Sequence, residues 1–242
     1  MFEPQQALTE QSVARLDLLN KYNHLTDAYV IVMLVHLRYG CVSGPLLVAI
    51  LKYLKIVVVI PVDFRCPICM SEKTVSLSRG SIQPLLFLPL GARLQMDFGF
   101  YKICSIRGFS CFLVIVESRS TTKWTYLRRS KHPPIELCLW FIRMARRVLG
   151  FSVTIVRTDG GGELWGSKDF RRRLFEEAQV IVEPTGGENS AANGKAKRAI
   201  GMLGVQAQLL LYAAGLEPIF WCFALLHATT LSNIKPRAEG RM

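Results

Sequence analysis

The sequence predicts an α/β domain built on a mixed five-stranded sheet with helices on both faces, preceded by a small, mostly helical unit. After Pro89 the apolar segments follow the order strand, strand, strand, helix, strand, helix, strand, helix, helix. Three consecutive strands most simply form a meander, whereas strands that alternate with helices favour parallel pairing. Before this region, a helix-like apolar stretch is followed by Cys66-Pro67-Ile68-Cys69. A chain of 242 residues is long enough for both parts.

The elements of the small unit come first. Residues 45–55 predict a helix that exposes Lys52 and Lys55. The β-branched residues 56–60 predict a strand or an extended segment. The predicted boundaries place a polar segment at 1–26, the small unit at 27–70, a linker at 71–89, the α/β domain at 90–236 and a tail at 237–242.

The α/β domain contains nine predicted elements. Residues 111–116 are almost entirely apolar, which is typical of a central strand. Residues 134–149 have an apolar side and a basic side, which predicts an amphipathic helix. Ser167 is the predicted N-cap of the next helix. The expected strands are 93–103, 109–117, 121–128, 152–158 and 180–183, and the expected helices are 134–149, 167–178, 191–214 and 217–231.

The composition excludes a disordered chain, because half of the residues are hydrophobic. The formal net charge of +12 suits a phosphate-rich partner, although it is also compatible with an ordinary basic surface. Lys52 and Lys55 interrupt the longest apolar stretch, so we expect no membrane span there. The start of the chain lacks the pattern of an export signal, so its seven cysteines favour thiols or metal ligands over disulfides.

Two aspartates are candidate metal ligands. Asp97 lies inside the first predicted strand of the α/β domain, and Asp159 lies at the end of the fourth, before three glycines. If these strands are neighbours, the two carboxylates can share a hard divalent cation such as Mg²⁺. The alternative is that Asp159 is a turn residue and Asp97 a charge at a strand edge.

Four segments of residues 88–236 together resemble the catalytic core of a copia-type retrotransposon integrase. Arg157-Thr158-Asp159-Gly160-Gly161-Gly162-Glu163 follows the family's Arg-Ser/Thr-Asp-x-Gly-Gly-Glu pattern. Asn193-Gly194-Lys195-Ala196-Lys197-Arg198 follows its Asn-Gly-x-Ala-Glu-Arg pattern except at the glutamate. Further on, residues 216–221 and 232–236 resemble its Leu-Pro-x-x-Phe-Trp and Asn-Arg-x-Pro segments. The resemblance implies an RNase H-like fold.

The resemblance also implies a function, DNA integration by a metal-dependent polynucleotidyl transferase. Its catalytic positions would be Asp97, Asp159 and the position of Lys197, with Mg²⁺ or Mn²⁺ at Asp97 and Asp159. Expected partners are element ends and target DNA, bound by a homo-oligomer and contacted near Asn193, Gly194, Lys195 and Arg198. The expected location is intracellular, in the nucleus or a virus-like particle. The limited extent of the chain fits a fragment of a polyprotein.

Such integrases carry a small His-His-Cys-Cys zinc domain before the core. Here His36, Cys41, Cys66 and Cys69 are the corresponding candidates, with Cys41 where the family has histidine. Cysteine is also a good zinc ligand, so the four side chains predict a tetrahedral Cys₃His site. The alternative is a reduced dithiol loop with His36 in a hydrophobic core.

Lys197 replaces the family's third carboxylate, which removes a ligand and adds a positive charge. About 6 Å from a divalent ion, with an effective dielectric constant near 20, the repulsion is on the order of 5 kcal/mol. Glu163 or Glu188 would have to supply the missing carboxylate, since residues 189–216 contain no acid. The chain is therefore expected to be inactive or weakly active.

Other interpretations remain open. Lys197 suits a remnant that binds nucleic acid without catalysis, because lysine contacts phosphates well. The chain also fits a decayed copy that is no longer a functional product, or, less well, a related RNase H-like nuclease. Basic residues elsewhere either line a DNA path or form solvated helix faces; they are Arg128, Arg129, Lys131, Arg143, Arg146, Arg147 and Arg171 to Arg173.

Overall fold

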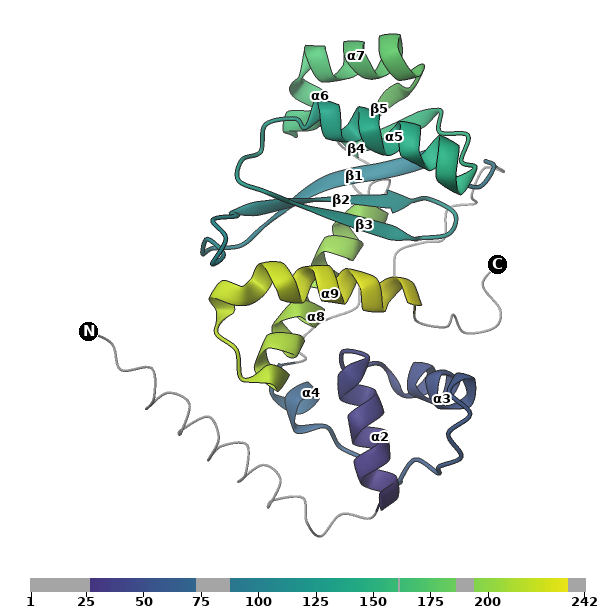
Figure 1. Cartoon of the computed structure of the whole chain (residues 1–242), viewed down its shortest axis with the longest axis vertical. Helices are drawn as coiled ribbons and strands as arrows, with labels where there is room; N and C mark the ends of the chain where they lie inside the picture. The colour runs from purple at the N-terminus through teal and green to yellow at the C-terminus, as the bar shows by residue number, and fades with distance from the viewer. Residues whose placement is uncertain (1–26, 73–87, 161, 186–193, 235–242) are drawn as a thin grey trace, which may run out of the picture. The chain divides into compact units, whose positions relative to one another are not determined.

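The computed structural model describes residues 27–72, 88–160, 162–185 and 194–234 (Figure 1). These residues fall into two units. The larger unit consists of residues 88–207 and 218–233, and the smaller unit of residues 27–72, 208–217 and 234. Within these ranges no helix combines the length and the apolar character needed to cross a bilayer.

The larger unit is built on a five-stranded sheet with the order β3-β2-β1-β4-β5. Its strands are β1 (Arg93–Phe100), β2 (Cys111–Glu117), β3 (Lys123–Arg128), β4 (Ile155–Asp159) and β5 (Ile181–Thr185). The first three pair antiparallel, and β4 and β5 continue the sheet in the direction of β1. This mixed sheet, with helices on both faces, is RNase H-like and confirms the predicted fold class.

The helices divide between the two faces of the sheet (Figure 1). One face is covered by α5 (Ile135–Leu149), α6 (Glu163–Gly166) and α7 (Lys168–Ala178). The first part of α8 (Gly194–Ala214) and α9 (Trp221–Ile234), which follows the short 3₁₀ helix η2 (Pro218–Phe220), lie on the other face.

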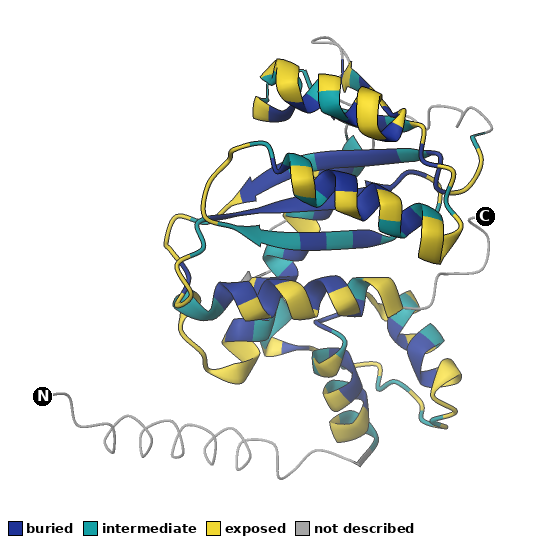
Figure 2. Cartoon of the chain, turned by 45° about the horizontal axis from the view of Figure 1, so that its top comes forward, coloured by how far each residue is buried: buried dark blue, intermediate teal, exposed yellow. Residues whose placement is uncertain are grey.

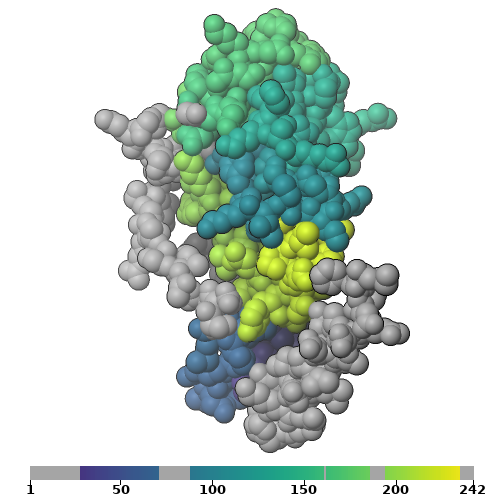
Figure 3. All heavy atoms as spheres, turned by 90° about the vertical axis from the view of Figure 1, so that its left-hand side faces the viewer, coloured from purple at the N-terminus to yellow at the C-terminus, as the bar shows by residue number. Residues whose placement is uncertain are grey.

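The main hydrophobic core lies between the sheet and α5 and α7. Leu94, Met96 and Phe98 of β1 point into it and meet Phe141 of α5 and Phe170 of α7. Figure 2 shows the central strands β1 and β2 largely in dark blue and the outward helix faces in yellow. With all heavy atoms drawn, the teal and green atoms of these elements pack directly against one another (Figure 3). The intervening β1 residues therefore face α8 and α9, and Asp97 is one of them.

The other face of the sheet is held by specific contacts to α9. Trp221 stacks on Tyr101 with ring centroids 4.3 Å apart, and its Nε1 donates to the Ile103 carbonyl. The side chain of Asn233 accepts from the Lys123 backbone N–H at 3.0 Å and donates to the Lys123 carbonyl at 2.7 Å. Both Trp221 and Asn233 belong to the integrase-like segments, and here they anchor α9 to the sheet.

The ends of the helices follow the expected local rules. Ser167 is the N-cap of α7, and its Oγ accepts from the Phe170 backbone N–H at 3.1 Å, as predicted. Gly150 ends α5 in the left-handed conformation, which glycine adopts without a steric penalty. The predicted strands start or end within three residues of the observed ones, and residues 191–193 of the predicted helix lie outside the described ranges.

The smaller unit contains α2 (Asp27–Arg38), α3 (Gly44–Tyr53) and α4 (Pro67–Glu72). Its core is formed by Val32, Val35, Leu47, Ile50 and Leu51. Residues 56–60 are extended but belong to no strand, while alternate residues pack against this core. The segment therefore has the predicted extended conformation without a pairing partner among the described residues.

Candidate functional site

The pairing of β1 with β4 brings the two candidate carboxylates to adjacent strands. Gln95 is the parallel partner of Arg157, and two residues further along each strand are Asp97 and Asp159. Because side chains alternate along a strand, both carboxylates lie on the face that α8 covers. The structure thus brings together the first two residues that the sequence singled out.

Asp97 is partly buried, and its Oδ1 accepts a hydrogen bond from the Phe98 backbone N–H at 2.8 Å. Burial raises the pKa of Asp97, and the nearby charge of Asp159 raises it further. The Phe98 hydrogen bond and the charge of Lys197 oppose this increase without cancelling it. A nearby cation therefore stabilises the ionised form of Asp97.

Lys197, in the first turn of α8, supplies that cation. Its Nζ lies 2.9 Å from Oδ2 of Asp159, and both side chains are a little under half exposed. The hydrogen bond to Asp159 raises the pKa of Lys197, so the amine is charged at neutral pH. A metal ion on Asp159 would have to displace this ammonium group.

The residues present do not fit a two-metal site with three carboxylates. Glu163 forms an ion pair with Lys131 at 3.2 Å, and its side chain is 46% exposed. Its pKa is lowered by a backbone hydrogen bond within the residue and by Lys131. Glu188 lies outside the described residues. Within those residues, Asp97 and Asp159 meet Lys197 instead of a third acid.

Two glycines beside the aspartates are explained by close packing within the chain. A Cβ on Gly99 would lie 2.1 Å from the ring of Phe112. A Cβ on Gly160 would lie 2.7 Å from the backbone oxygen of Thr185. Both distances are too short for a real side chain, so glycine lets β1 and β4 lie close to their neighbours.

The predicted nucleic-acid contacts near the site have partners of their own. The ammonium group of Lys195 donates to the carbonyl of Ser118, and burial lowers the pKa of Lys195. Nε of Arg198 donates to the Gly194 carbonyl at 2.9 Å, and within the described ranges the rest of its exposed guanidinium has no further hydrogen bond. Gly194 is the first residue of α8, and Asn193 lies outside the described residues.

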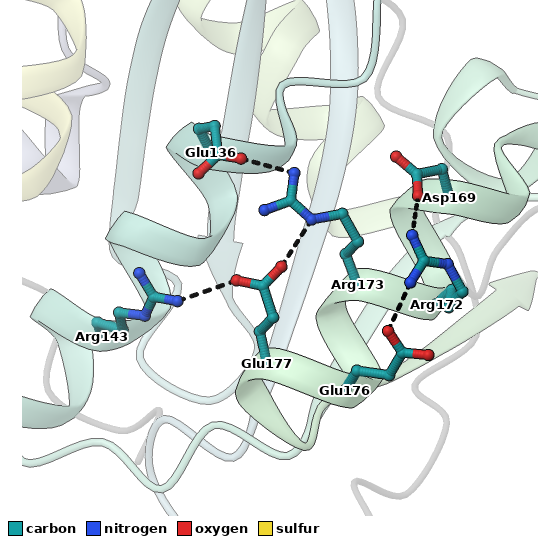
Figure 4. Close-up of polar contacts among 7 residues, drawn as sticks. All are labelled: Glu136, Arg143, Asp169, Arg172, Arg173, Glu176 and Glu177. Atoms are coloured by element: carbon teal, nitrogen blue, oxygen red, sulfur yellow. Dashed lines mark hydrogen bonds and ion pairs between the residues drawn. The ribbon is translucent and has the colours of Figure 1, made fainter.

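Three basic residues on α5 and α7, namely Arg143, Arg172 and Arg173, are engaged in ion pairs, as Figure 4 shows. Glu177 pairs with Arg143 at 3.2 Å and with Arg173 at 2.6 Å. Arg173 also pairs with Glu136, and Arg172 lies between Asp169 and Glu176. These contacts favour the interpretation of solvated helix faces over that of a DNA path.

A charged cluster on the α8 face of the sheet was not anticipated. Arg157 of β4 and Arg93 of β1 place their guanidinium groups 3.0 and 3.7 Å from Oε2 of Glu183 on β5. Burial and the charge of Arg157 lower the pKa of Arg93. The sequence contained a signal for this cluster, because on each of these three strands the charged residue alternates with apolar residues.

The second candidate site lies in the smaller unit, where His36, Cys41, Cys66 and Cys69 form one cluster. One ligand atom from each residue lies within 4.8 Å of the others, and only Cys69 is not fully buried. Nε2 of His36 is 3.2 Å from Sγ of Cys69. Neighbouring ligand atoms in a tetrahedral zinc site are roughly 3.5–3.8 Å apart, so zinc fits after a contraction of about 1 Å.

Two local structures assemble this cluster. After α2, Gly40 and Cys41 both adopt positive φ angles, and the Cys41 N–H donates to the His36 carbonyl at 2.8 Å. This turn brings the Cys41 thiol back towards the His36 ring. Cys66 precedes α4, and its carbonyl accepts from the Met70 N–H at 3.0 Å, so one helical turn separates it from Cys69.

Two thiols of the cluster have pKa values shifted in opposite directions. A hydrogen bond from Cys41 lowers the pKa of Cys66, while that hydrogen bond and burial raise the pKa of Cys41. The ring of Phe64 contacts His36 edge-on at 5.5 Å, and Nδ1 of His36 is buried with no hydrogen-bond partner in the described part of the chain. Three thiols and one imidazole are ligand types that a soft metal ion such as zinc prefers.

No family model and no curated protein matches the chain. Among solved structures, a chain of the simian T-cell lymphotropic virus intasome in complex with PP2A regulatory subunit B56 gamma matches with a TM-score of 0.46 and 17% identity. That match covers 66% of this chain and 55% of the other, so the chain spans about half the length of its counterpart.

Two integrase core domains give similar values. The catalytic core domain of BIV integrase matches with a TM-score of 0.44 and 18% identity over 61% of this chain and 87% of that chain. The HTLV-2 integrase catalytic core domain in complex with magnesium, in its dimeric form, matches with a TM-score of 0.45 and 16% identity over 62% and 91%. The TM-scores and identities are measures of overall similarity only. The assignment of the RNase H-like fold rests on the order and the directions of the strands.

Proposed function

We propose that the chain is the core of a copia-type retrotransposon integrase whose acidic site is blocked for metal-dependent DNA chemistry by Lys197. The RNase H-like sheet and the four integrase-like segments support descent from a polynucleotidyl transferase. By this descent the partners would be element ends and target DNA, bound by a homo-oligomer in the nucleus or a virus-like particle.

The contact between Lys197 and Asp159 carries the proposal. At 2.9 Å the ammonium group is in direct contact with a carboxylate that would have to bind the metal. In the intact family a third carboxylate here helps to hold Mg²⁺ or Mn²⁺, which promotes attack on a phosphodiester. With Lys197, the cation that neutralises Asp97 and Asp159 belongs to the protein and cannot activate a nucleophile.

A remnant that binds nucleic acid without catalysis is the second candidate. The net charge of +12 and the partly available Arg198 near the site favour it. Phosphate contacts make such binding strongly salt-dependent, whereas catalysis additionally requires the divalent ion. The two candidates therefore differ in one observable, which is whether Lys197→Glu restores metal-dependent cleavage.

We also propose that the four-residue cluster of the smaller unit binds one zinc ion. The observation behind this is the convergence of three thiols and one imidazole within 4.8 Å. Metal analysis of the purified chain should give one zinc per chain, and Cys69→Ser should lower this value well below one. Cys104→Ser is the matched control, because Cys104 is exposed and outside the cluster. Zinc-free folded protein, or equal loss in both variants, would reject the site.

The catalytic proposal is tested by a DNA strand-transfer and nicking assay with Mg²⁺ or Mn²⁺. The unmodified chain is compared with Lys197→Glu and with Asp159→Asn, and each folded sample is checked for DNA binding. We expect activity only in Lys197→Glu. Activity of the unmodified chain that Asp159→Asn abolishes would contradict the block by Lys197. Salt-dependent binding without cleavage in all three would favour the remnant, and the absence of both would reject both candidates.

A further inference from the structure

The extended segment 56–61 of the smaller unit has apolar side chains that are highly exposed. Ile56, Val58 and Ile60 pack against the core formed by α2 and α3. Val57 is fully exposed, and Val59 is 84% exposed. Alternation of this kind is that of a strand with one face on a core, yet here the outward face is valine instead of a polar residue.

The backbone of this segment is also unpaired. Residues 57–60 make no hydrogen bond through their backbone within the described part of the chain, and the segment is assigned to no sheet. β-Branched residues of this kind prefer a pleated, hydrogen-bonded environment. Pro61 lacks an N–H and interrupts one edge, but the edge formed by Val58 and Ile60 keeps its donors and acceptors.

The charges at the two ends of segment 56–61 indicate which partner pairs with it. Lys55 precedes the segment and Asp63 follows it, and both are exposed. In an antiparallel pair of two identical segments, the Lys55 end of each copy faces the Asp63 end of the other. A parallel pair would instead bring like charges together, which is destabilising. The nearby Arg65 guanidinium is directed to the Phe64 carbonyl at 3.1 Å.

We propose that residues 56–61 are a dimerisation strand, which pairs antiparallel with the same segment of a second copy of this chain. The pair would satisfy the backbone groups of Val58 and Ile60 and bring the outward valines Val57 and Val59 of one copy beside those of the other. Because two six-residue strands bury less than a standard interface of about 1,600 Å², the dimer should be weak and concentration-dependent. The inference concerns the smaller unit alone and is independent of the acidic site.

Sedimentation velocity of the full chain over a wide concentration range tests the proposal. We expect a monomer–dimer equilibrium that Val59→Lys shifts to monomer by at least tenfold in Kd. Val148→Lys is the matched control, since Val148 is an exposed valine on α5, and it should leave the equilibrium unchanged. Circular dichroism verifies that each variant is folded.

A charge exchange identifies the pairing direction. Lys55→Glu and Asp63→Lys should each weaken the dimer, and the double variant should restore it. A monomer at every concentration, an open-ended assembly, or a dimer that Val148→Lys disrupts and Val59→Lys does not would overturn the proposal. A dimer that both single charge variants leave unchanged would overturn the antiparallel arrangement.

Discussion

Nζ of Lys197 lies 2.9 Å from Oδ2 of Asp159, so the first turn of α8 is joined to the end of β4 by an ion pair. Both side chains are partly exposed, and pairs of this kind contribute about 0–1 kcal/mol to stability. The consequence for function is larger, because the ammonium group occupies the neighbourhood in which a divalent ion would be held. The protein thus carries its own counterion for Asp97 and Asp159.

Removing this counterion should change the titration of Asp97. The charge of Lys197 lowers the pKa of Asp97, so Lys197→Gln should raise it. The free energy of unfolding should change by less than about 1 kcal/mol, because the pair is exposed. Carboxyl ¹³C NMR measures the titration, with Lys168→Gln, an exposed lysine of α7, as the control. An unchanged Asp97 titration would mean that Lys197 does not act on it.

Asp97 itself should be a source of instability at neutral pH. Its folded-state pKa is raised, mainly by burial. Its contribution to stability is therefore present below the unfolded pKa and is lost as pH rises through the folded pKa. Asp97→Asn keeps an acceptor for the Phe98 N–H, and it should raise Tm at pH 7 by about 1–3 °C with a smaller gain at pH 4. Equal gains at both pH values, or a loss at pH 7, would contradict this reasoning.

Glu117 should protect the fold against mild acid. The side chain is buried, and burial alone would raise its pKa, but N–H groups of Arg119, Ser120 and Gly91 donate to the carboxylate and lower it. Such a group stabilises above its unfolded pKa and loses that effect as pH falls through the folded pKa.

Glu117→Gln should accordingly cost about 1–3 kcal/mol at pH 7 and less at pH 3. Urea unfolding at both pH values measures the difference. Glu136→Gln, whose side chain is 76% exposed, should have little effect at either pH. A cost for Glu117→Gln that is the same at both pH values would show that its charge is not involved.

Arg146 should be structural and not a DNA contact. Its Nη2 donates to the carbonyls of Val153 and Ala178 at 2.6 and 2.7 Å, which ties α5 to the segment before β4 and to the end of α7. Arg146→Ala should destabilise by about 1–3 kcal/mol without a specific loss of DNA affinity. Its neighbour Arg147 is exposed, so Arg147→Ala should leave stability unchanged. The opposite order of effects would reject this assignment.

The sheet was predictable because local signals and tertiary structure agree there. The apolar run in β2 is buried throughout, and Ser167 caps α7 as its position indicated. The approach of Asp97 to Asp159 followed from the assumption that β1 and β4 are neighbours, which the strand order confirms. The site could be predicted to the extent that its residues lie on neighbouring strands of the sheet.

Other features depend on contacts that a sequence pattern does not reveal. The helix α2 is apolar on several sides, so its sequence lacks the amphipathic period that identifies a surface helix. Residues 56–60 have strand propensity, but pairing requires a neighbour that propensity cannot supply. The hydrogen bonds between the side chain of Asn233 and the backbone of Lys123 join residues 110 positions apart, and only the folded chain brings them together.

The central claim is that Lys197 excludes the metal ion from Asp97 and Asp159. Its most direct test is a Mg²⁺ titration of the unmodified chain and of Lys197→Glu in which thermal unfolding is measured at each Mg²⁺ concentration. Mg²⁺ is chosen because a thiol-rich cluster prefers softer ions. We expect Lys197→Glu to gain stability with Mg²⁺, by about 2.7 kcal/mol at a hundredfold excess over Kd, while the unmodified chain gains none. A Mg²⁺-dependent gain in the unmodified chain that Asp159→Asn removes would contradict the account, because Lys197 would then not exclude the metal.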